Sequence, residues 1–115
     1  MKKLILFFFI VAISSMAKAQ TPSLSSALIS DFKSLVQQGI IQYYPESAQI
    51  VRINPDIWNS WSFTERKGFT ENLCIYVNRY IRGDLKYADW FVQIESMATK
   101  KKLARLTRLT GYKEF

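Results

Sequence analysis

Apolar side chains recur every three or four residues along two stretches of the chain, a spacing typical of helices that bury one side. The first stretch follows Thr21-Pro22, where Thr21 would cap the helix and Pro22 would take its first position. Gly39 is a typical C-terminal stop. We therefore expect a helix over residues 22–38. Its apolar side would carry Leu24, Leu28, Phe32, Leu35 and Val36.

The second helical stretch begins at Ser62, which forms the capping-box pattern S-x-x-E with Glu65. It ends at Gly83. On a regular helix, one side would carry Phe69, Leu73, Tyr76, Val77, Tyr80 and Ile81. The opposite, polar side would carry Lys67, Glu71, Asn78 and Arg79, with Cys74 at the margin of the apolar side.

The other segments favour strands. Residues 48–53 and 89–96 alternate between the two faces of a strand, and residues 40–44 are a shorter β-prone run that would pair with 48–53 as a hairpin. Residues 102–108 also allow a helix, because leucines recur there every three residues. A strand is favoured because the preceding strand ends close by. Residues 111–115 would extend it as an edge.

This order predicts an α+β fold with two main helices packed on one face of a small antiparallel sheet of three to four strands. We expect one domain over residues 20–115. The chain has a single cysteine, so no intramolecular disulfide can support so small a core. Large aromatic side chains must supply that stability, and Trp90, at the head of an alternating strand, is expected in the core.

A short helical turn opened by Asn54-Pro55 places Trp58 and Trp61 on one side. Together with Tyr43 and Tyr44, Trp61 could form a flat platform for a ligand such as a sugar ring. The alternative, which we favour, is that both indoles close the end of the core. Arg66 lies at the position from which a guanidinium could stack on Trp61.

The run V-R-I-N-P-D-I-W is followed by K-G-F-T-E-N-L-C-I-Y, W-F-V-Q-I-E-S and K-K-L-A-R-L. Over residues 51–115 this pattern resembles small exported bacterial domains whose function is not established. In those domains a Val-x-Ile/Val-x-Pro-x-x-Trp entry precedes a helix and a Trp-led hairpin. The usual hairpin glycine is replaced here by Thr99-Lys100. The resemblance implies a fold and transfers no catalytic residue.

The N-terminus has the three parts of a secretory signal peptide. Two lysines precede the uncharged run 4–17, and Ala17-Lys18-Ala19 supplies small residues before a cleavage site between Ala19 and Gln20. A permanent membrane anchor is the alternative. The uncharged run would reach about 21 Å as a helix, short of the roughly 30 Å hydrocarbon core, so cleavage of residues 1–19 is favoured.

Export changes the charge balance. Removing Lys2, Lys3 and Lys18 from 16 basic residues leaves 13 against 9 acidic residues, so the net charge falls from +7 to +4. Six cations fall close together near the C-terminus, opposed there by Glu114 alone. They are Lys100, Lys101, Lys102, Arg105, Arg108 and Lys113.

This basic run is the strongest functional signal in the sequence. Lys100, Lys101, Lys102, Arg105 and Arg108 could bind an anionic polymer or a lipid surface. The alternative is a solvated hairpin whose lysines keep its edge from pairing with other chains.

The sequence contains little catalytic chemistry. It has no histidine, and no spacing suggests a metal or a cofactor. Cys74 lies in mid-helix without a base beside it, so a buried, unreactive thiol or an intermolecular disulfide is expected. Asp84 and Asp89 could serve a hydrolase as acid and base, but turn and capping roles are favoured.

These features favour a small exported binding or structural module of the bacterial envelope, periplasmic or secreted, without enzymatic activity. Its partner could be an envelope protein or an anionic surface polymer. The sequence contains no dedicated nucleic-acid motif, and membrane contact is expected only through an uncleaved signal segment. The alternatives are a binder of anionic polymers or lipid through the basic hairpin, and a carboxylate-dependent hydrolase.

Overall fold

The computed structural model describes residues 21–115, so the expected signal segment and the cleavage site at Ala19 and Gln20 lie outside the described residues. The helical elements are α1 (Ser26–Gln37), η3 (Pro45–Ser47), α2 (Pro55–Asn59), α3 (Phe63–Ile75), η4 (Tyr76–Ile81) and η5 (Tyr87–Asp89). The strands are β1 (Ile41–Gln42), β2 (Ile50–Ile53), β3 (Phe91–Ser96), β4 (Lys102–Thr107) and β5 (Gly111–Glu114).

The helix boundaries follow from local capping. The hydroxyl of Ser25 accepts the amide of Leu28 at 3.2 Å, so α1 begins at Ser26 and not at Pro22 as expected. The capping box that opens α3 is confirmed. The amide of Ser62 donates to Glu65 at 2.8 Å, and the amide of Glu65 donates back to the Ser62 hydroxyl at 3.2 Å.

The α+β class is confirmed, but the expected antiparallel sheet of three to four strands is wrong. Five strands lie in the order β1-β2-β3-β4-β5, and β2 runs parallel to β3 while the other neighbours are antiparallel. The parallel pair arises because the chain leaves β2, crosses one face through α2 and α3, and returns in the same direction. The strand at 102–108 and the hairpin of the first two strands are confirmed.

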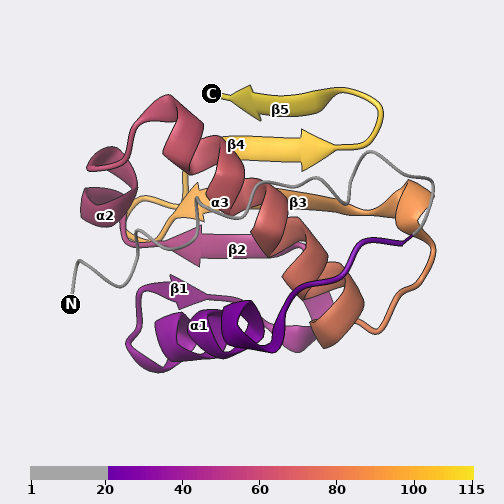
Figure 1. Ribbon diagram of the computed structural model, residues 1–115. Coiled ribbons are helices and arrows are strands. Elements are labelled where there is room, and N and C mark those ends of the chain that lie inside the picture. Colours follow the sequence, from indigo (N-terminus) through magenta and orange to yellow (C-terminus); the bar gives the residue numbers. More distant parts are fainter. Residues whose placement is uncertain (1–20) are drawn as a thin grey trace.

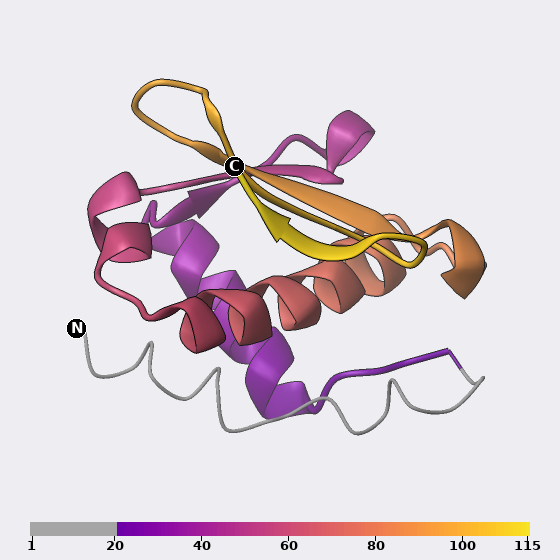
Figure 2. The same cartoon turned by 90° about the horizontal axis from the view of Figure 1, so that it is seen from above.

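Both long helices lie on the same face of the sheet (Figure 1). Figure 2, which views the sheet nearly edge-on, shows α1 and α3 below it, whereas only the short η3 turn lies above it, at the upper right. The side chains of β3 alternate accordingly, with Val92, Ile94 and Ser96 buried toward the helices. Apart from η3, the described helices therefore leave one face of the sheet uncovered.

The prediction that Asn78 lies on the polar side of the helix is wrong. From Tyr76 the chain is π-helical, and the extra residue in each turn rotates the side chains relative to a regular helix. Asn78 is fully buried, and its amide nitrogen donates to the carbonyls of Cys74 at 2.8 Å and Phe91 at 3.0 Å. Its amide oxygen accepts from Gln49 at 2.9 Å. A buried amide thus connects the end of the main helix to the sheet.

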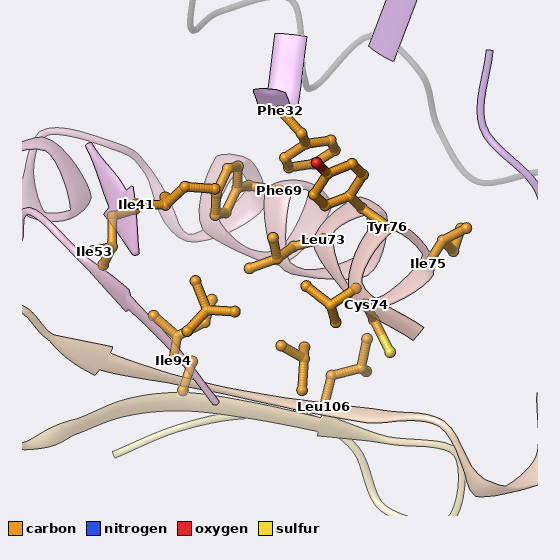
Figure 3. Close-up of a cluster of buried hydrophobic side chains, with 14 of the residues drawn as sticks. Phe32, Ile41, Ile53, Phe69, Leu73, Cys74, Ile75, Tyr76, Ile94 and Leu106 are labelled. Atoms are coloured by element: carbon orange, nitrogen blue, oxygen red, sulfur yellow. The ribbon is translucent and has the colours of Figure 1, made fainter. Parts of the chain in front are cut away.

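The core lies between the two long helices and the covered face (Figure 3). The ring of Phe32 from α1 stacks on Tyr76 at 4.9 Å and lies 5.8 Å from Phe69 of α3. The exposed fraction is 4 % for Trp58, 6 % for Trp61 and 2 % for Trp90. The prediction that the indoles close the core is confirmed.

Candidate functional site

The uncovered face of the sheet carries polar side chains aligned in rows across the strands. One row places Ile50 of β2, Gln93 of β3, Arg105 of β4 and Lys113 of β5 side by side. It spans three gaps of about 4.8 Å, or about 14 Å in all. We call this surface the open face; it is formed by Ile50, Arg52, Phe91, Gln93, Glu95, Lys102, Arg105, Lys113 and Phe115.

Hydrogen bonds link the middle of the open face. Arg52 and Glu95 form an ion pair at 3.4 Å, and the side-chain amide of Gln93 donates to the other oxygen of Glu95 at 2.9 Å. The guanidinium of Arg105 donates twice to the amide oxygen of Gln93, at 3.2 and 2.9 Å. The charge of Glu95 is therefore offset by Arg52. Arg105, by contrast, is held by a neutral acceptor, which does not offset its positive charge.

Three cations surround the ring of Phe115. The charged groups of Lys102, Arg105 and Lys113 lie 5.8, 5.6 and 5.3 Å from the ring centroid. The ring is 57 % exposed. Cations at these distances are attracted to the face of an aromatic ring. The result is a cluster of positive charge around an exposed hydrophobic centre, which we call the Phe115 cluster.

The one carboxylate in this part of the chain points to the other side of the sheet. Glu114 binds Arg66 of α3 through two contacts, at 2.8 and 3.2 Å, and accepts the hydroxyl of Tyr112 at 2.6 Å. The hydrogen bond from Arg66 is the main reason why the pKa of Glu114 lies below its usual range. Because alternation along β5 places Glu114 beneath the sheet, it does not neutralise Lys113 above it.

The structure separates the predicted basic run into three places. Lys102 and Arg105 lie in the Phe115 cluster, where Lys113 joins them. Lys100 and Lys101 lie in the β3–β4 turn, which rises on the uncovered side of the sheet in Figure 2. Arg108 lies at the opposite end of β4, over the ring of Tyr87 at 3.9 Å. It therefore does not share the open face with the others.

The tyrosines and tryptophan proposed as a ligand platform do not form one exposed group. Trp61 is buried and packs on Phe69 at 4.8 Å, so its ring offers no free surface. Tyr43 and Tyr44 border a small hollow of about 80 Å³ beside β1. The expected guanidinium contact involves a different indole, because Arg66 lies over Trp58 at 5.8 Å.

A larger pocket of about 320 Å³ lies on the helix side, between α3 and the β4–β5 hairpin. Its walls include the rings of Tyr87, Trp90 and Tyr112. Glu71 borders it, and burial raises the pKa of this carboxyl while neighbouring Lys67 partly opposes the shift. The sequence did not reveal this pocket, because its lining comes from three separate segments.

Cys74 also borders this pocket, and Figure 3 shows its sulfur pointing from α3 toward Leu106. Burial raises the pKa of the thiol to about 12, so very little thiolate exists at neutral pH. Asp84 lies in a turn, where it accepts the amide of Lys86 at 2.8 Å and pairs with Arg82 at 3.2 Å. These contacts are those of a turn-forming residue.

No family model, curated protein or solved structure matches the chain. Within residues 21–115, no helix combines the length and apolar character needed to cross a bilayer. The same part of the chain contains no cluster of three or more side chains that could hold a metal ion.

Proposed function

We propose that this chain is an exported binding module of the bacterial envelope that holds an anionic polymer against the open face of its sheet. The observation that supports this most strongly is the Phe115 cluster. Lys102, Arg105 and Lys113 converge on one exposed ring, and none of them forms an ion pair with a carboxylate among residues 21–115.

A polymer fits this surface better than a small anion. The three cations lie on the adjacent strands β4 and β5, around an exposed ring, so a partner with several charges could meet all of them. A single exposed charge pair contributes only about 0–1 kcal/mol. A partner with repeated charges can engage several cations at once and release several counterions, so several weak contacts add up to a higher total affinity. Lys100 and Lys101, at the end of the same strands, would extend the contact.

The test replaces Lys102, Arg105 and Lys113 together with glutamine and measures binding to heparin over a range of salt concentrations. A matched variant replaces Lys33, Lys67 and Lys86, which lie on α1, on α3 and in the loop after η4. Both variants have the same net charge. We expect the open-face variant to lose most of its affinity and its logarithmic salt slope to fall by about two to three, while the matched variant binds nearly as well as the parent.

Equal losses in the two variants would show that net charge alone drives the interaction and would reject the open face as the site. Replacing Lys100, Lys101 and Lys102 with glutamine tests the β3–β4 turn in the same assay. Stronger binding to anionic vesicles than to heparin would replace the polymer with a lipid surface as the partner.

The export part of the proposal rests on the N-terminal pattern of two lysines, an uncharged run and Ala17-Lys18-Ala19. It predicts that the protein recovered from the envelope of a bacterial host starts at Gln20. Mass spectrometry of the intact protein measures this. A protein that retains residues 1–19 and sediments with membranes would favour a permanent anchor.

A further inference from the structure

The pocket between α3 and the β4–β5 hairpin is separate from the open face, because it lies on the opposite side of the sheet. Its volume of about 320 Å³ is at the lower end of the range for small-molecule sites. The lining includes Ile75 and Leu106, and three aromatic residues, Tyr87, Trp90 and Tyr112, also contribute to it. A partly enclosed hollow of this size, lined by both apolar and polar side chains, fits a small molecule with an apolar body and a polar end.

The aromatic walls have few polar groups to offer a ligand. The indole N–H of Trp90 donates to the carbonyl of Asp84 at 3.1 Å. The hydroxyl of Tyr112 donates to Glu114 at 2.6 Å. Because these two polar atoms are already used inside the protein, the two rings present mainly carbon to the pocket.

Unlike these aromatic rings, three side chains that border the pocket are charged. Lys67 and Glu71 belong to α3, and Arg108 belongs to the turn after β4. Arg108 is exposed, yet its guanidinium is held over Tyr87 at 3.9 Å, which leaves the edges of the guanidinium available. Within residues 21–115 neither Lys67 nor Arg108 forms an ion pair. A planar guanidinium positioned in this way suits two parallel hydrogen bonds to a carboxylate.

We propose that this pocket binds a small monocarboxylic acid with an aromatic or branched aliphatic body, whose carboxylate is received by Arg108. The apolar body would lie against Trp90, Tyr112 and Leu106. Lys67 would add a second favourable charge. Glu71 would repel a second carboxylate, so a dicarboxylate is a poor ligand for this site.

The test uses hydrocinnamate, benzoate and isocaproate as probes, with hydrocinnamide as the uncharged counterpart of the first. Two-dimensional amide NMR spectra of the purified protein report which residues respond. We expect signals of α3 and of the β4–β5 hairpin to shift, with a dissociation constant of about 1 mM or lower for the best acid. Hydrocinnamide should bind at least about tenfold more weakly.

Arg108→Gln should weaken the best acid by about tenfold, and Arg108→Lys, which keeps the charge but not the planar fork, by a smaller factor. Arg79→Gln is the matched control, because Arg79 also lies over a tyrosine ring but does not border the pocket. The proposal is overturned if none of the three acids shifts these signals, if the amide binds as well as the acid, or if Arg108→Gln binds like the parent. The heparin assay is independent of this result.

Discussion

The two faces of the sheet are built from the same strands but have different roles. On the face that α1 and α3 cover, Val51, Val92 and Ile94 are fully buried. On the open face, the intervening positions carry a hydrogen-bonded row that includes Arg105 and ends near the Phe115 cluster. Alternation along each strand makes this division possible, because neighbouring side chains point to opposite sides.

The difference shows that one residue type, phenylalanine, has different roles on the two faces. Phe69 is fully buried among aromatic rings, whereas Phe115 is 57 % exposed among cations. Changes on the covered face should therefore alter stability, and changes on the open face should alter binding.

Phe69→Ala should lower the free energy of unfolding by about 3–5 kcal/mol, because it removes a fully buried ring and leaves a cavity between Phe32 and Trp61. Urea denaturation followed by tryptophan fluorescence measures the loss. Phe115→Ala is the matched change on the open face, with an expected effect below about 0.5 kcal/mol. Similar losses for the two variants would remove the distinction between the faces.

Asn78→Ala should cost about 2–3 kcal/mol, because the carbonyl of Phe91 and the side chain of Gln49 would lose their partners beneath the sheet. Asn59→Ala, an exposed change at the end of α2, provides the control. The same urea titrations apply. A loss at Asn78 no larger than at Asn59 would mean that the buried amide does not hold η4 against β3.

Glu114→Gln should cost about 1 kcal/mol near neutral pH, because it weakens the paired contact with Arg66. The pKa of Glu114 in the folded protein is lowered chiefly by the hydrogen bond from Arg66. Its contribution is therefore complete above the pKa of an unfolded glutamate and is lost as the pH falls through the lower, folded pKa.

Urea titrations at a series of pH values should accordingly show the parent and Glu114→Gln converging as the solution becomes acidic. Glu46→Gln, at an exposed position, should differ little from the parent throughout. A Glu114 difference that widens on acidification would contradict the assigned direction of the pKa shift.

The smallest stability effect is expected on the open face itself. Replacing Lys102 and Lys113 with glutamine should change the free energy of unfolding by less than about 0.5 kcal/mol, because both ammonium groups are exposed and lack carboxylate partners among residues 21–115. The same variant should bind heparin more weakly. A large loss of stability would indicate a structural role for these lysines.

Much of the fold was predictable because local signals were strong. The capping box at Ser62 and Glu65 marks the start of α3. Strict alternation predicted a strand over 89–96, and β3 covers Phe91–Ser96, because residue 89 belongs to the turn η5. The aromatic core was predictable because a small chain without disulfides needs large side chains to enclose its interior.

The remaining features depend on tertiary geometry. Strand direction was missed because β2 and β3 become neighbours only after α2 and α3 cross the sheet. The burial of Asn78 was missed because a helical wheel assumes regular turns, and η4 is π-helical.

The candidate site was predictable in part. The density of cations near the C-terminus marked the region, and Lys102 and Arg105 do lie together. The sequence grouped Arg108 with these cations. It lies apart from them because it belongs to the turn between β4 and β5, which places it over Tyr87. The pocket beneath the hairpin gave no local signal.

The assignment of binding to one face can be measured by titrating isotope-labelled protein with a short sulfated oligosaccharide and following side-chain and amide NMR signals. The account predicts that the side-chain signals of Arg105, Lys113 and Phe115 shift first and saturate together, while those of α1 and α3 remain in place. Shifts centred on the two helices, or spread evenly over all cations of the chain, would contradict it.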